Sequence, residues 1–381
     1  MIYLDNAATT FKKPQSVLDS VMNAYKESTS VGRGGYESAM KAAETVYGAR
    51  EKAAELFGAS APEQVVFTSN ATHALNLAIK GVLREGNCVI SGYEHNSVVR
   101  PIKACHGLEC RIATGKLFCP EIIARSFERL IDKNTVFAVC THMSNVFGYI
   151  LPIERIDEIC YKKGVPLIID ASQSAGSLPI KISRLRACVC ICMPGHKGLY
   201  GPQGTGLLIC REGEKLNTII EGGTGSVSRD ITQPAFMPDR LECGTHNVPG
   251  IAGLSAGMSY ITERGEGAIM RHERSLMREI ARGLRRLEGI KVFSSSDALL
   301  QGGVLSFVSD KMSAEEIANV LSDKKIAVRS GFHCSPLSHE SVGTVKGTVR
   351  VSVSDFTDEN EVAVFLKTLS DILSERQKTT N

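Results

Sequence analysis

The sequence contains no tryptophan, and only 6% of its 381 residues are aromatic. This shortage of flat rings argues against a surface that stacks on sugars or on nucleobases. An excess of one charge is also missing, because 44 lysines and arginines against 41 acidic residues leave a net charge of +3. No basic run supplies the electrostatic patch that nucleic-acid binding requires. We therefore expect no nucleic-acid partner.

Long apolar runs are absent as well. A membrane-spanning helix needs about 20 consecutive apolar residues, and no stretch approaches that length. The first residues, MIYLDNAATTFKKP, lack the charged region and the apolar region of a secretory signal. We therefore expect a cytoplasmic protein without a membrane partner, in which the twelve cysteines stay reduced.

Three of the cysteines, Cys188, Cys190 and Cys192, alternate within the apolar run ACVCICM. Alternation predicts that all three side chains lie on one face of a strand. A structural zinc site usually takes paired cysteines from loops, with a second pair elsewhere. We therefore expect no metal site, and we interpret these thiols as buried strand residues that act as small hydrophobic groups.

From about residue 60 the chain alternates short apolar runs with segments of helical period. Strands are predicted within 63–70, 135–145 and 165–173 and within the runs CVISGYEH, ACVCICM and TGLLIC, and helices within 71–86 and 153–164. Nearly continuous apolar strands alternating with helices indicate an α/β fold, with a mostly parallel central sheet covered by helices on both faces. The length alone favours two or three domains.

The pattern changes after about residue 250. Amphipathic helices at roughly 266–287 and 358–376 alternate with short strands in VLSFVSD, IAVRSG and TVRVSVSDF. We therefore predict a large α/β domain over residues 15–250. A smaller α+β domain is predicted from residues 1–14 and 251–381, and it carries Cys334.

Polar clusters follow four of the predicted strands, with the sequences TSNATH, GYEHNS, THMSNVFG and DASQSAG. In parallel sheets the functional residues gather just beyond the carboxyl ends of the strands. We therefore expect these four clusters to surround one pocket.

Lys197 lies in a glycine-rich segment, GHKGLYGPQGTG. A lone loop lysine is usually a solvated surface charge, but its expected neighbours are unusual. Asp170 closes the apolar strand VPLIID, where a carboxylate is costly without a positive partner. Gln173 follows it, His95 ends another strand, and Thr72 begins a helix whose free N–H groups form an anion site. A lysine, a buried acid, an aromatic ring and a phosphate seat match the needs of pyridoxal phosphate.

Further motifs, spread over nearly the whole chain, strengthen this interpretation. They are YLDNAATT, NATHALN, EHNS, SNVFGYILPI, DASQSAG, GHKGLYGPQGTG, ECGTHN, RSGFHCSP and RVSVSDFTDENEV. In these motifs the chain resembles class V, fold-type I pyridoxal-phosphate enzymes, and within them the type II branch of cysteine desulfurases and selenocysteine lyases. The resemblance implies a fold-type I transferase that works as a homodimer.

The resemblance also implies a role for each motif residue. Lys197 would hold pyridoxal phosphate as a Schiff base, Asp170 would pair with the pyridine nitrogen, Gln173 would contact the phenolic oxygen, and His95 would stack on the ring. The remaining residues would bind the phosphate or the substrate carboxylate: Ala71, Thr72, His196 and, from a second subunit, Thr245 for the phosphate, and Asn145 and Arg350 for the carboxylate.

Cys334 differs from the other cysteines because RSGFHCSP is polar and rich in turn-forming residues. In the chemistry of the resembled family, Lys197 moves the Cα proton of L-cysteine and the Cys334 thiolate attacks the substrate sulfur. The products are alanine and a persulfide, which a sulfur-acceptor protein then takes. The expected catalytic residues are therefore Lys197, Cys334 and His95.

The chain departs from the resembled family at several positions. Pro194 replaces a serine or threonine, and proline has neither a hydroxyl nor an N–H, so one phosphate hydrogen bond is missing or is supplied by another group. Phe332 replaces the first of two histidines, and after RVS the sequence VSDFT keeps only the general shape of the family motif. A selenocysteine lyase, another pyridoxal-phosphate activity such as an aminotransferase, racemase or carbon–sulfur lyase, and a non-catalytic scaffold remain as alternatives.

Overall fold

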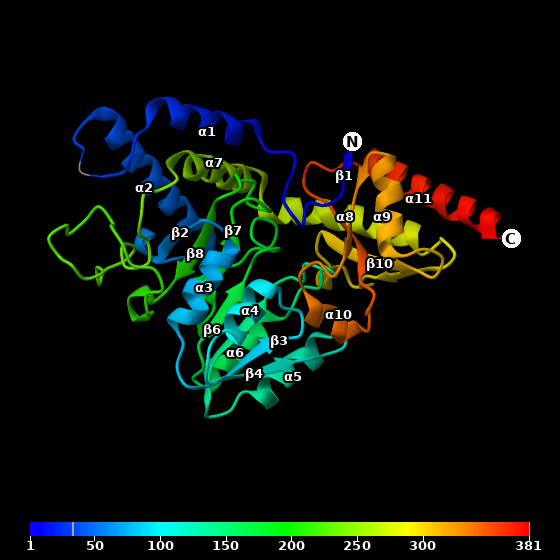
Figure 1. Cartoon of the computed structure of the whole chain (residues 1–381), viewed down its shortest axis with the longest axis horizontal. Helices are drawn as coiled ribbons and strands as arrows, with labels where there is room; N and C mark the ends of the chain where they lie inside the picture. Colours follow the sequence, from blue (N-terminus) through cyan, green and yellow to red (C-terminus); the bar gives the residue numbers. More distant parts are fainter. Residues whose placement is uncertain (33, 381) are drawn as a thin grey trace.

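A seven-stranded sheet forms the centre of the computed structural model, which describes residues 1–32 and 34–380 (Figure 1). Its order is β2-β8-β7-β6-β5-β3-β4. The strands are β2 (Val65–Thr68), β3 (Gly86–Ser91), β4 (Leu108–Ala113), β5 (Thr135–Thr141), β6 (Leu167–Asp170), β7 (Cys188–Pro194) and β8 (Gly206–Cys210). Strand β8 runs antiparallel to both of its neighbours, whereas the ladder from β4 to β7 is parallel. The predicted α/β fold with a mostly parallel sheet is confirmed.

Helices cover both faces of this sheet. They are α1 (Gln15–Glu27), α2 (Glu37–Phe57), α3 (Ala71–Gly81), α4 (Asn96–Lys103), α5 (Pro120–Leu130), α6 (Ile153–Lys162) and α7 (Val248–Arg264). Apolar residues of α3 and α4 pack on one face, and those of α2, α5, α6 and α7 pack on the other. No helix in the described ranges combines the length and the apolar character needed to cross a bilayer.

The helix predicted over 71–86 is shorter in the structure. It ends at Gly81, and Gly86 is the first residue of β3. Gly86 has φ +142, and a Cβ there would lie 2.4 Å from the carbonyl oxygen of Asn134. Gly86 therefore marks the entry to a strand, where only glycine fits, rather than the end of the preceding helix.

The cysteines of β7 do not share one face, so this prediction is wrong. The register shifts between β6 and β7, where Leu167 pairs with Cys188 and the next residue, Ile168, pairs with Cys190. At this bulge one residue of β7, Val189, has no partner on β6, so the side chains that follow it point to the opposite face from the one that alternation predicts. Cys188 packs beneath α2, α5, α6 and α7, whereas Cys190 and Cys192 pack beneath α3 and α4, and all three are fully buried.

A second apolar core lies beside the large sheet, around a four-stranded antiparallel sheet of order β12-β13-β10-β9. Its strands are β9 (Ile290–Phe293), β10 (Val304–Ser309), β12 (Arg329–Gly331) and β13 (Thr348–Ser352), and its helices are α8 (Glu266–Leu284), α9 (Ala314–Asp323), α10 (Pro336–Val342) and α11 (Glu359–Thr380). The described residues also form four short 3₁₀ segments, at 62–64, 182–184, 213–215 and 298–300.

The N-terminal segment joins this second core. Strand β1 (Ile2–Tyr3) pairs in parallel with β11 (Ile326–Ala327), and Leu4 is buried among the residues of the small unit. Figure 1 shows the N-terminus beside α9 and α11, far from α1 in the large unit.

The domain division stays a prediction, and we propose one change to it. Helix α7 packs against α1 and α2, and its residues Leu254 and Met258 belong to the core beneath the large sheet. We therefore propose that the large unit extends to Arg264, at the end of α7, rather than to residue 250.

Candidate active site

A cavity of about 220 Å³ lies beyond the carboxyl ends of β2, β3, β5, β6 and β7. Ten of the eleven expected site residues line it: Ala71, Thr72, His95, Asn145, Asp170, Gln173, His196, Lys197, Cys334 and Arg350. The large unit supplies eight of them, and the small unit supplies Cys334 and Arg350. The four polar clusters after the strands therefore share one pocket, as the sequence predicts.

Thr245 lies elsewhere. It lines a second cavity, of about 230 Å³, together with Ser69, His73 and His246. Its expected role involves a second subunit, so that role stays a prediction.

The backbone at Lys197 is fixed by a close approach between two loops. A Cβ on Gly198 would lie 2.3 Å from the carbonyl oxygen of Ala175, and one on Gly176 would lie 2.1 Å from that of Gly198. Gly176 also has φ +93, which favours glycine. The carbonyl of Lys197 accepts the N–H of Tyr200 at 2.9 Å. Glycine at these two positions thus lets the lysine loop pack directly on the loop that follows Asp170.

The charges of Lys197 and Asp170 respond to their burial. Burial lowers the pKa of Lys197 to about 8, and the positive charges of Arg350 and Arg329 act in the same direction against the attraction of Asp170. Burial raises the pKa of Asp170, which is 2% exposed, and hydrogen bonds from Ser172 oppose that change. The N–H of Ser172 donates to Oδ1 of Asp170 at 2.9 Å. The site therefore combines an easily deprotonated amine with an oriented carboxylate.

His95 presents a neutral ring to the cavity. Burial lowers its pKa to about 4, and the nearby charge of Lys197 adds to the effect. His95 also caps α4, because its Nδ1 accepts the N–H of Ser97 at 3.0 Å. The hydroxyl of Ser97 lies 2.8 Å from that of Thr72, so the first turns of α3 and α4 are joined.

The start of α3 offers an anion seat at the cavity. Ala71 and Thr72 are its first two residues, and their N–H groups have no partner within the helix. Asn70 caps the helix by accepting the N–H of His73 at 2.9 Å. Pro194 also lines the cavity and supplies no donor, whereas Ser97, another lining residue, has a hydroxyl.

His196 is held by the N-terminal segment. Its Nδ1 lies 3.1 Å from the hydroxyl of Thr9, and its carbonyl accepts the N–H of Thr10 at 3.1 Å. Burial lowers the pKa of His196 to about 4, with Lys197 and Lys13 adding to the shift. The ring is therefore neutral and can serve as a hydrogen-bond donor.

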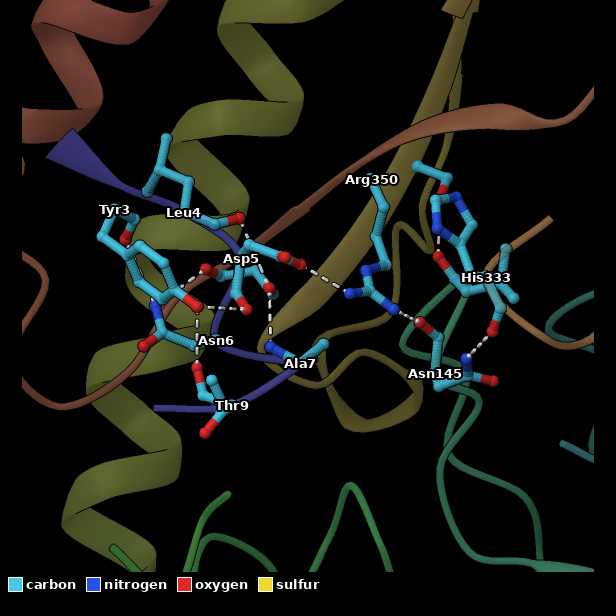
Figure 2. A network of polar contacts seen from close by, with 12 residues as sticks. Tyr3, Leu4, Asp5, Asn6, Ala7, Thr9, Asn145, His333 and Arg350 are labelled. Atoms are coloured by element: carbon cyan, nitrogen blue, oxygen red, sulfur yellow. Dashed lines mark hydrogen bonds and ion pairs between the residues drawn. The ribbon is translucent and has the colours of Figure 1, made fainter. Parts of the chain in front are cut away.

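The sequence alone assigns no role to Asp5, which lies in the motif YLDNAATT. Figure 2 shows Asp5 facing Arg350, and the carboxylate lies 2.6 Å from Nη2. Arg350 is 2% exposed, and its Nη1 donates to the carbonyl of Asn145 at 3.1 Å. Burial lowers the pKa of Arg350, and Asp5 opposes that change. The carbonyl of Ala7 accepts Nε2 of Gln173 at 3.0 Å, so the N-terminal segment contacts both units.

Cys334 is exposed on a strained loop. His333 and Cys334 have φ +50 and +57, which costs a non-glycine residue about 1–2 kcal/mol each. His333 is buried beside it, with its Nε2 3.1 Å from the hydroxyl of Thr348, and burial lowers its pKa to about 2. Phe332 is half-exposed, and its ring packs edge-on at 5.2 Å from that of His339.

The family model for aminotransferase class-V matches residues 2–365. The chain belongs to the aminotransferase class-V family. A probable cysteine desulfurase of Methanothermobacter thermautotrophicus is 31% identical over 97% of this chain and 94% of its own length. A cysteine desulfurase of Synechococcus elongatus is 29% identical over 95% of this chain, which spans only 59% of that longer protein.

Solved cysteine desulfurases share the fold. The apo structure from Thermococcus onnurineus superposes with a TM-score of 0.91 at 30% identity, covering 98% of this chain and 95% of the other. A desulfurase of Escherichia coli, solved in an S-sulfonic acid form, gives 0.85 at 25% identity over 98% and 94% of the two chains. The resemblance found in the sequence, including the fold-type I architecture, is thereby confirmed.

Proposed function

We propose that this chain is a pyridoxal-phosphate-dependent cysteine desulfurase, which converts L-cysteine to L-alanine and leaves a persulfide on Cys334. The observation that carries the proposal is one cavity lined by an easily deprotonated lysine, a buried acid, an arginine and an exposed cysteine. The similarity to cysteine desulfurases over nearly the full length supports it.

The cavity fits pyridoxal phosphate by the chemistry of its donors. Lys197 offers an amine that reacts with an aldehyde, and Asp170 offers a buried carboxylate for a protonated ring nitrogen. His95 offers a neutral ring for stacking, and the first turn of α3 offers N–H groups for a phosphate. When bound, pyridoxal phosphate supplies an electron sink for negative charge at the substrate Cα.

The chain's own groups then carry the proton and the substrate. The lowered pKa of Lys197 leaves a usable fraction of neutral amine near pH 7, so Lys197 acts as the base for the Cα proton. Arg350 is the cation for the substrate carboxylate, and Asn145 adds an amide donor. Asp170 would hold the ring nitrogen protonated, and Gln173 would contact the phenolic oxygen.

Cys334 supplies the nucleophile. Its thiolate attacks the substrate sulfur, an S–S bond forms, and the Cβ–S bond breaks. The electron pair of the broken bond stays with the carbon skeleton, which is protonated and leaves as alanine. Because the cysteine is exposed, a sulfur-acceptor protein can reach the persulfide. A second copy of the chain completes the phosphate site with Thr245, so we also propose a homodimer.

The test is incubation of purified protein with pyridoxal phosphate and L-cysteine, with assays for alanine and for protein-bound persulfide. Cys334→Ala should keep the visible absorbance of the bound cofactor and lose alanine formation. Cys119→Ala, at a partly exposed cysteine outside the cavity, is the matched control and should stay active. Full activity of Cys334→Ala on L-cysteine would remove the desulfurase assignment. Activity of that variant on selenocysteine alone would favour the selenocysteine lyase.

A further inference from the structure

We propose that the side chain of Asn145 ties the nucleophile's loop to the substrate carboxylate, and that Ser335 is the positioning residue that anchors this amide to the loop. The proposal deepens the proposed function and rests on it, because that function assigns the carboxylate to Asn145 and Arg350. What is added is a direct link between the two reacting partners through a single amide.

The amide of Asn145 already contacts the cysteine loop with both of its ends. Its Nδ2 donates to the carbonyl of His333 at 2.8 Å, a bond drawn in Figure 2. Its Oδ1 accepts the hydroxyl of Ser335 at 2.7 Å. A primary amide has two N–H donors, so one hydrogen on Nδ2 remains after the bond to His333. Because Asn145 lines the cavity, that hydrogen is available to a carboxylate held by Arg350.

The contacts also fix which way the amide faces. A flipped amide would set Oδ1 against the carbonyl oxygen of His333, and two acceptors cannot form a hydrogen bond. Ser335 is fully buried and holds the amide in place by donating to Oδ1. Loss of its hydroxyl would leave a nearly buried acceptor unpaired and loosen the link between Asn145 and the cysteine loop, while the carbonyl of His333 still keeps Nδ2 on its own side.

Three consecutive residues of the loop are thereby anchored. The carbonyl of His333 and the hydroxyl of Ser335 bind Asn145, and the carbonyl of Cys334 accepts the N–H of Asn96 at 2.8 Å. Asn96 is the first residue of α4 and follows His95 directly. These bonds offset the strain of the two left-handed residues and hold the backbone of the nucleophile against the large unit.

The consequence is catalytic positioning. With its backbone fixed, the sulfur of Cys334 moves relative to the substrate mainly by rotation about its side-chain bonds. Holding two reacting groups in place accounts for much of the rate in such reactions, and a displacement of about 1 Å can cost about 100-fold. Removing Ser335 should therefore affect the chemical step more than substrate binding.

The test compares Ser335→Ala with Ser338→Ala, using holoenzyme for kinetics and cofactor-free protein for amide hydrogen exchange. Ser338 is an equally buried serine of α10 whose hydroxyl has no hydrogen-bond partner among the described residues, so it is the matched control. Ser335→Ala should lower kcat about 10- to 100-fold, leave KM for L-cysteine within about 2-fold, and speed exchange of the Asn96 amide. Ser338→Ala should change none of these.

A second variant keeps the idea testable if Ser335→Ala does not fold. Asn145→Asp replaces the donor with a carboxylate that repels both the carbonyl of His333 and the substrate. It should raise KM, lower kcat and speed exchange of the Asn96 amide. Unchanged exchange together with unchanged kcat in the folded variants would overturn the positioning role. If the wild-type protein makes no alanine from L-cysteine, the proposed function itself is refuted, whatever the hydrogen exchange of the Asn96 amide shows.

Discussion

Replacing Arg50 with methionine should destabilise the protein strongly, because it removes the cation from a buried ion pair. The guanidinium of Arg50 faces the carboxylate of Glu242, with Nη1–Oε1 and Nη2–Oε2 distances of 2.7 and 2.5 Å. The two side chains are 8% and 6% exposed. Glu242 also accepts the backbone N–H of Phe67 and lies 2.7 Å from Nε2 of His246.

The size of the destabilisation follows from the loss of the cation that faces the carboxylate of Glu242. Burial raises the pKa of Glu242, but the hydrogen bonds and charges of Arg50 and His246 outweigh it and hold the pKa below its ordinary value. Removing one partner of such a pair leaves an uncompensated buried charge and costs about 3–5 kcal/mol. For a chain of this length, that corresponds to a fall of about 4–6 °C in Tm.

The assay is thermal unfolding of Arg50→Met beside Arg155→Met. Arg155 pairs with Glu121 at the surface, where its loss should cost less than about 1 kcal/mol. Equal effects of the two substitutions would refute the reasoning. Since the lowered pKa of Glu242 belongs to the folded state, its stabilisation is present above the ordinary glutamate pKa and is lost as the pH falls through the lowered value. The difference in Tm between the wild type and Arg50→Met should therefore become smaller at acidic pH.

Two further predictions concern the lysine loop. In cofactor-free protein, the reaction of Lys197 with an added pyridoxal aldehyde should reach half its maximum near pH 8, because burial lowers the pKa of its amine to about 8. Absorbance titration checks this; a midpoint near the ordinary lysine value, or the same signal from Lys197→Ala, would contradict it. Gly198→Ala should destabilise the protein by about 1–3 kcal/mol, since its Cβ would lie 2.3 Å from a backbone oxygen. Gly223→Ala, where a Cβ meets open space, should be nearly neutral in the same denaturant titration.

The sequence predicted the sheet and the pocket because both follow from local patterns. The apolar run that ends at Asp170 identifies a buried strand, and the polar residues after each strand identify the functional edge. The Asp5–Arg350 pair could not be predicted from local pattern, because its partners are 345 residues apart. In the sequence, only the family resemblance connects the motif YLDNAATT with the active site.

Other features depend on contacts that no local pattern reveals. The bulge that separates Cys188 from Cys190 arises from pairing with β6, and strict alternation predicted the opposite. The resemblance placed Asn145 at the substrate carboxylate, yet its amide also contacts the cysteine loop. The partners there are His333 and Ser335, which follow Asn145 by 188 and 190 positions in the sequence. Such bonds are visible only once the two units have been placed side by side.

The N-terminal segment has a consequence for how the enzyme is made. Its residues are synthesised before the large unit, but their hydrogen-bond partners, Ala327 and Ser352, are synthesised after it. Long-range pairing of this kind is slow to form during folding. A nascent chain can therefore assemble most of the large sheet while the wall around Arg350 is still missing. Chains that end before Cys334 and Arg350 should accordingly lack a finished pocket.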